Sequence, residues 1–92
     1  MTMATAPTFD VREPDEFTGE LGHLPGARLV PLGALSASAE DWKKGDPLLI
    51  VCRSGARSAR AAELLVQAGF ESVLNLEGGM LAVNAKNLPV ER

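Results

Sequence analysis

Short apolar stretches alternate along this chain with segments whose apolar residues recur every three or four positions. The first pattern is typical of β-strands and the second of amphipathic helices. The predicted strands are residues 8–12, 27–30, 48–52 and 72–76. The third of them, Leu48 to Cys52, is apolar throughout without alternation, which is typical of a central parallel strand buried on both faces.

Helices are predicted between these strands and after the last one. Pro14 and the acidic residues beside it favour a helix start after the first strand. The spacing of apolar residues, and the glycines that would end each helix, predict two longer helices over 32–42 and about 57–68. A short last helix is predicted over 80–87. The apolar stripes of the two longer helices are Leu32, Leu35, Ala39 and Trp42, and then Ala61, Leu64, Leu65 and Ala68. Alternating strands and helices predict an α/β fold with a parallel sheet and right-handed crossovers.

Length and composition predict one domain over residues 1–92, with a loose N-terminal end over 1–7. The 46% hydrophobic content is sufficient for a modest core. Residues 1–9 show no positive start followed by an apolar run, and the longest apolar run is far below the roughly 20 residues that cross a bilayer. We therefore expect a cytoplasmic protein without a membrane partner.

The charge of the chain is acidic overall but basic in one place. A net charge of −3 and a pI near 5.0 argue against binding to nucleic acid or anionic membranes. Between Pro47 and Ala62 there is no acidic residue, yet Arg53, Arg57 and Arg60 lie there. This local positive patch indicates attraction of a small anion, although a solvated helix face explains Arg60 equally well.

The chemistry of the chain centres on Cys52, its only cysteine. One Cys excludes an intrachain disulfide, and with one His it cannot form a closed structural zinc site. Cys52 ends the apolar strand, where open α/β sheets bind ligands, and a loop from Arg53 to Ala56 leads into a helix. Loop amides and the helix dipole there favour a thiolate with a lowered pKa, and Arg53 and Arg57 would lower it further if they point inward. The alternative is a buried Cys that acts as a small hydrophobic residue.

The residues around Cys52 resemble those of a known family. The loop Cys52-Arg53-Ser54-Gly55-Ala56-Arg57-Ser58 is similar to the active-site loop of the rhodanese homology domain. Further family signatures occur in the same order along the chain, and together they span Asp10 to about Pro89. These signatures are Asp10-Val11-Arg12 with Glu16-Phe17, Gly22-His23-Leu24-Pro25-Gly26-Ala27, and Asn75-Leu76-Glu77-Gly78-Gly79.

This resemblance implies a rhodanese-like open parallel sheet of four to five strands, with helices on both faces and the order 4-3-1-2 for the four core strands. It implies sulfurtransferase activity through a persulfide on Cys52, without a metal or an organic cofactor. The donor would be a small anionic sulfur compound such as thiosulfate, or a persulfide. The acceptor would be cyanide or a thiol, including that of a thioredoxin-like protein. The loop amides of Arg53 to Ser58 would bind the substrate, and Arg12 and Glu16 would form a structural ion pair.

Two departures from the family concern the rim of the pocket and the substrate preference. Val83 stands where family members often carry Trp, and the N-terminal segment is shortened. Other residues have a structural interpretation: His23 bonds backbone groups in its turn, and Asp10 is a hydrogen-bonding residue at a strand end. Ser54 and Ser58 either donate to the persulfide or complete the loop. Trp42 and Met80 are predicted core residues.

Three other functions remain open on the same fold. The chain could be a persulfide carrier between partner proteins, an arsenate reductase or phosphatase, or a non-catalytic interaction domain. A phosphatase loop has five residues between the Cys and a closing Arg, whereas four separate Cys52 from Arg57. Ser58 occupies the position of that Arg, and Val51 replaces the His that commonly precedes the phosphatase Cys. The loop therefore favours sulfur over phosphate.

Overall fold

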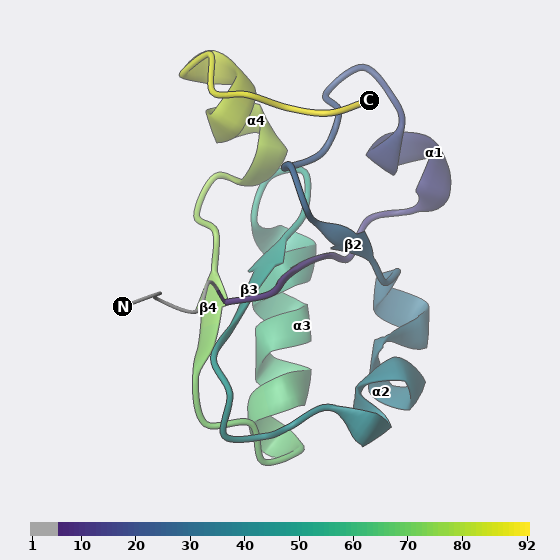
Figure 1. Ribbon diagram of the computed structural model, residues 1–92, viewed down its shortest axis with the longest axis vertical. Coiled ribbons are helices and arrows are strands. Elements are labelled where there is room, and N and C mark those ends of the chain that lie inside the picture. The colour runs from purple at the N-terminus through teal and green to yellow at the C-terminus, as the bar shows by residue number, and fades with distance from the viewer. Residues whose placement is uncertain (1–5) are drawn as a thin grey trace.

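The computed structural model of the protein describes residues 6–92 (Figure 1). Four short parallel strands alternate with helices in the predicted order, and the predicted helix over 32–42 is the one element that the structure breaks up. The strands are β1 (Thr8–Asp10), β2 (Arg28–Leu29), β3 (Leu48–Val51) and β4 (Val73–Asn75). The helices are α1 (Pro14–Phe17), α2 (Leu35–Ser38), α3 (Ala56–Gln67) and α4 (Gly79–Ala85), with 3₁₀ turns at Leu32–Ala34 and Ala39–Asp41.

The strands form one sheet in the order β2-β1-β3-β4 with all pairs parallel. This is the predicted order 4-3-1-2 counted from the other edge, so the prediction is confirmed. The central pair, β1 and β3, aligns Asp10 with Val51. The pairing continues one step further, because the amide of Val11 donates to the carbonyl of Val51 at 3.0 Å. Cys52 therefore lies at the carboxyl end of an interior strand.

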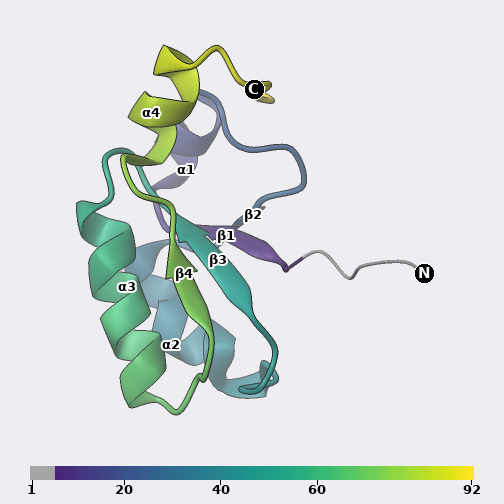
Figure 2. The same cartoon turned by 90° about the vertical axis from the view of Figure 1, so that its left-hand side faces the viewer.

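Helices contact both faces of the sheet, but they cover them unequally. Figure 2 shows α2 and α3 side by side on one face, where Ile50 belongs to the larger buried cluster. Val51 points to the opposite face, since successive strand residues alternate, and it joins a smaller cluster with Met80 and Val83 of α4. On this face α4 covers only the carboxyl end of the sheet. Leu74 of β4 consequently remains 59% exposed.

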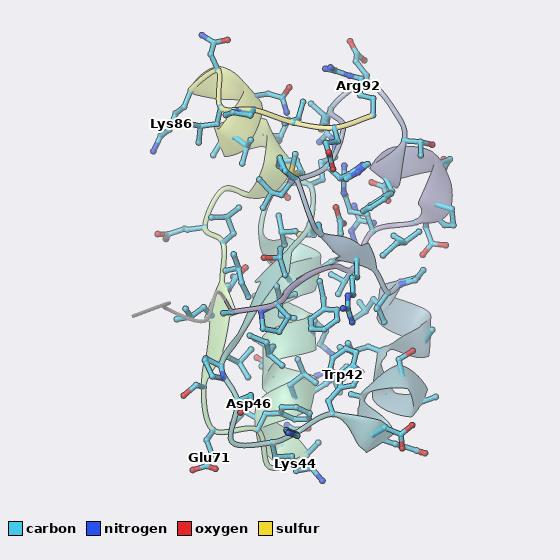
Figure 3. All side chains as sticks on the ribbon, in the orientation of Figure 1. Trp42, Lys44, Asp46, Glu71, Lys86 and Arg92 are labelled. Atoms are coloured by element: carbon cyan, nitrogen blue, oxygen red, sulfur yellow. The ribbon has the colours of Figure 1, made fainter. Side chains whose placement is uncertain are left out.

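The predicted helix over 32–42 is interrupted in the structure. It consists of α2 between two 3₁₀ turns, although Leu35 and Ala39 are buried as the spacing predicts. Gly33 and the serines in this stretch are weak helix formers, and a segment this short gains little from helix propagation. Trp42, labelled in Figure 3, is half-buried. Its ring stacks on that of Phe9 with centroids 4.1 Å apart.

The predicted apolar stripe of α3 needs a correction at both ends. Ser58, Ala61 and Leu65 are its buried residues, whereas Leu64 is half-buried and Ala68 is exposed. Ala68 is the C-cap residue, where α3 ends. At the other end, Ser58 is buried because the loop of Cys52 closes over the first turn.

The predicted loose end over residues 1–7 lies largely outside the described residues. Pro7 is described, and its carbonyl accepts a hydrogen bond from the amide of Leu49 at 2.9 Å, which extends the pairing of β1. Within residues 6–92, the helices are all too short or too polar to cross a bilayer.

Candidate active site

The loop after β3 turns back on itself so that its amides point at the sulfur of Cys52. Gly55 makes this turn possible with a φ of 107°, a left-handed conformation that favours glycine, and α3 begins at the next residue. The amide of Gly55 donates to Cys52 Sγ at 3.1 Å, and the amide of Ser58 donates at 3.3 Å. Cys52 itself is 1% exposed. The sulfur therefore sits at the N-terminus of a twelve-residue helix, where backbone amides and the dipole favour negative charge.

Opposing effects act on the pKa of the Cys52 thiol. Burial is the largest of them and raises the pKa, because a thiolate loses hydration inside the protein. Hydrogen bonds from the Ser58 hydroxyl and from the amides of Ser58, Gly55 and Ser54 favour the thiolate and together outweigh burial. The pKa is therefore lowered from the ordinary thiol value. A lowered pKa raises the thiolate fraction near neutral pH, as nucleophilic cysteines require.

The hydroxyl of Ser58 has more possible acceptors than it has protons. Its oxygen lies 3.4 Å from Cys52 Sγ, and it also faces the carbonyl of Gly55 at 3.1 Å and Asn75 Oδ1 at 2.5 Å. Asn75 Nδ2 in turn donates to the carbonyl of Gly55 at 3.4 Å. Asn75 thus connects β4 to the Cys52 loop. The sequence did not single out this role, and the only signal for it was the position of Asn75 in the Asn75–Gly79 signature.

The Gly78-Gly79 turn holds the loop from the other side. The amide of Met80 donates to the carbonyl of Cys52 at 2.9 Å, and the amide of Leu81 donates to that of Arg53 at 3.0 Å. These contacts need a close approach of two backbones. A Cβ on Gly79 would collide with the carbonyl oxygen of Cys52 and lie 2.6 Å from that of Arg53. The absence of a side chain at Gly79 therefore allows α4 to dock on the loop.

The prediction of an ion pair between Arg12 and Glu16 is wrong. Arg12 binds Asp10 instead, with Nη2 at 2.7 Å from Oδ2, and it also donates to the carbonyl of Gly22 at 2.7 Å. Both Asp10 and Arg12 are fully buried, so each satisfies the other's charge where water is excluded. Asp10 is thus a hydrogen-bonding residue at a strand end, as predicted.

Glu16 pairs with Arg57 across the site. The guanidinium donates from Nη1 and Nη2 to the two carboxylate oxygens of Glu16 at 2.6 and 2.7 Å. The hydrogen bond from Arg57 is the largest cause that lowers the pKa of Glu16 from 4.5 to about 2, against a smaller effect of burial. The same bond raises the pKa of Arg57. This bidentate pair joins α1 to the first turn of α3.

The remaining residues predicted for the loop lie at the surface. Ser54 and Ala56 are exposed, and Arg53 is exposed beside a cleft of about 240 Å³. Figure 1 shows that α1 and α4 lie at the end of the molecule where α3 begins, so they flank the loop. The cleft is lined by Arg12, Asp15, Glu16, Gly19, Glu20, Leu21 and Arg53.

His23 lies in its turn with a structural set of contacts. Its Nδ1–H donates to the carbonyl of Phe17 at 2.8 Å, and its ring stacks on that of Phe17 with centroids 3.7 Å apart. The contact with a backbone carbonyl agrees with the predicted role. Among residues 6–92, His, Cys, Asp and Glu side chains form no group of three that could hold a metal ion.

Comparison with known proteins gives the family. The pattern of the rhodanese-like domain matches residues 2–86, and the chain belongs to this family. It is 37% identical to a sulfurtransferase of Allochromatium vinosum over 88% of this chain and 74% of that protein. It is 33% identical to the thiosulfate sulfurtransferase GlpE of Vibrio cholerae over 99% of this chain and 84% of that protein. A rhodanese-like domain of an Anabaena protein superposes with a TM-score of 0.82 and 29% identity, covering 92% of this chain and 97% of that one.

Other curated relatives are longer than this chain. The chain spans 57%, 44% and 37% of three proteins, two from Bacillus subtilis and one from Synechocystis, to which it is 39–41% identical. The match therefore establishes a rhodanese-like domain, and the activity of the whole protein belongs to the proposal below. The donor, the acceptor and the roles of individual residues are matters for proposal.

Proposed function

We propose that this protein transfers sulfane sulfur from thiosulfate or a persulfide to cyanide or a thiol, through a persulfide on Cys52. One observation carries the proposal: two backbone amides and the Ser58 hydroxyl converge on Cys52 Sγ at 3.1 to 3.4 Å. Such donors stabilise negative charge on the sulfur, whether it is a thiolate or a persulfide. In this role Arg53 to Ser58 form the binding loop.

The reaction takes place in two displacements. The Cys52 thiolate attacks the outer sulfur of the donor and forms an S–S bond, while the bond to sulfite, or to the donor thiolate, breaks and the leaving group takes the electron pair. The acceptor then attacks the outer sulfur of the Cys52 persulfide, and the Cys52 thiolate leaves. Both steps balance without a metal or an organic cofactor, so we propose none. Covalent transfer of this kind gives ping-pong kinetics.

The acceptor decides between an enzyme for small molecules and a carrier in a relay. A small thiol or cyanide makes the chain an independent enzyme, and this is the function we favour. A protein thiol, such as that of a thioredoxin-like protein, would make it a relay module. Comparison of transfer rates to cyanide, to a small thiol and to reduced thioredoxin distinguishes the two.

Intact-protein mass spectrometry tests the proposal directly. After incubation with thiosulfate or with cysteine persulfide, the protein should gain one sulfur atom that cyanide removes. Because Cys52 is the only cysteine, Cys52→Ser is a complete control and should gain none. Sulfur transfer that persists in Cys52→Ser, or a wild-type protein that neither donor loads, would contradict the proposal.

A further inference from the structure

We propose that Glu16 makes the Cys52 site selective for persulfide donors over thiosulfate, by keeping Arg57 in an ion pair. The inference rests on the proposed sulfur transfer, and it names the class of donor that the site accepts. The charge around the loop is less positive than the three arginines in the sequence indicate.

The two classes of donor differ in the charge that they bring to Cys52. Thiosulfate is a dianion, so its reaction with the thiolate gathers three negative charges and ends as a persulfide and sulfite. A persulfide gathers at most two, and only one when its outer sulfur is protonated, and it ends as the Cys52 persulfide and the donor thiolate. Turnover of thiosulfate therefore needs more positive charge at the loop than turnover of a persulfide.

Two of the three arginines beside the loop, Arg57 and Arg12, supply little of this charge. Both outer nitrogens of Arg57 are bound to Glu16, at 2.6 and 2.7 Å, so the pair presents little net charge to a ligand. Arg12 is buried against Asp10. Within residues 6–92, Arg53 is the one arginine that lines the cleft without an ion pair.

Unpaired acidic side chains outnumber that arginine in the lining of the cleft. Asp15 and Glu20 are exposed there, and neither has an ion-pair partner among residues 6–92. Arg92 approaches Glu20, but it donates to the backbone carbonyl and leaves the carboxylate unpaired. Repulsion from these carboxylates therefore acts most strongly on a dianion beside Arg53. A persulfide needs only the amides of Gly55 and Ser58, which the loop already directs at the sulfur.

The substitution Glu16→Gln removes the charge of the carboxylate and keeps the shape of the side chain. In Glu16→Gln, kcat/KM for thiosulfate with cyanide as acceptor should rise about tenfold, chiefly through a lower KM, because Arg57 becomes available to the dianion. With cysteine persulfide as donor, the change should stay within about twofold. A second substitution, Glu16→Gln with Arg57→Gln, should abolish the gain.

Glu63→Gln is the matched control. Glu63 pairs with Arg60 at 3.3 Å on the exposed side of the same helix, so its loss changes the net charge equally but away from the cleft. In this variant, kcat/KM for thiosulfate and kcat/KM for cysteine persulfide should both remain at wild-type values. Thiosulfate turnover that is unchanged in Glu16→Gln, or a gain that persists after Arg57→Gln, would overturn the inference.

Salt dependence of the wild-type protein gives a measurement that needs no variant to fold. If the cleft carboxylates repel thiosulfate, added KCl should screen the repulsion and raise kcat/KM for thiosulfate more than for cysteine persulfide. A thiosulfate kcat/KM that falls with salt would contradict the selectivity. Intact-protein mass spectrometry tests the sulfur transfer itself separately. If neither donor adds a sulfur atom to Cys52, the proposed function fails, whatever the selectivity.

Discussion

Gly79→Ala tests how much the docking of α4 on the Cys52 loop contributes to stability. Gly79 has a φ of 55°, and an added Cβ would overlap the carbonyl oxygens of Cys52 and Arg53. Both oxygens also accept hydrogen bonds from the amides that follow Gly79. The overlap is with backbone on both sides, so no side chain can move aside to relieve it.

The magnitude follows from the two separable effects. A left-handed conformation destabilises a non-glycine residue by about 1–2 kcal/mol. Loss or weakening of two backbone hydrogen bonds adds about 1 kcal/mol each. The sum, about 3–4 kcal/mol, is a large part of the roughly 5–14 kcal/mol expected for a domain of this length. The midpoint of thermal unfolding should therefore fall by roughly 15–25 °C.

Urea and thermal unfolding followed by circular dichroism measure this effect against two matched glycines. Gly26 has a φ of 79° with nothing near its Cβ position, so Gly26→Ala should show the conformational part alone, about 1–2 kcal/mol. Gly33 has open space and no positive φ, so Gly33→Ala should be close to neutral or slightly stabilising. If Gly79→Ala loses no more stability than Gly26→Ala, the docking contacts contribute nothing and the reasoning is refuted.

Three further predictions concern charge and reactivity. Ser58→Ala removes a hydrogen bond that favours the thiolate, so the pKa of Cys52 should rise and its alkylation by iodoacetamide at pH 7 should slow; an unchanged pH profile of alkylation would contradict this. The pKa of Glu16 is about 2 in the folded protein, below the 4.5 of the free group, so its contribution to stability is complete above pH 4.5 and is lost as the pH falls toward 2. Unfolding midpoints measured across that range should decline less steeply in Glu16→Gln than in the wild type. The protein should not hydrolyse p-nitrophenyl phosphate under conditions in which it transfers sulfur, because Ser58 stands where a phosphatase has its closing Arg; hydrolysis that depends on Cys52 would show the opposite preference.

Local pattern predicted the strands and the helices, whereas the order of the strands followed from the family resemblance. The unbroken apolar run of β3 marked the centre of the sheet, and the breakers around it marked the turns. The prediction for residues 32–42 was less accurate. The spacing of the apolar residues indicates which of them are buried, but not whether the backbone between them stays helical. The site residues at Cys52 to Ser58 came from their place after β3 and from the family resemblance. Their chemical roles remain predictions.

The sequence by itself determined that a thiol would stand at the end of a buried strand, before a glycine turn and a helix, since each of these features depends on neighbouring residues. Only the tertiary structure decided which charges meet around it. Arg57 and Glu16 are 41 positions apart, and their pairing depends on where α1 docks beside α3. Asn75 reaches the loop for the same reason, because β4 pairs with β3. Charges and hydrogen-bond partners that lie far apart in the chain carry no local pattern, so folding of the whole sheet was needed to bring them together.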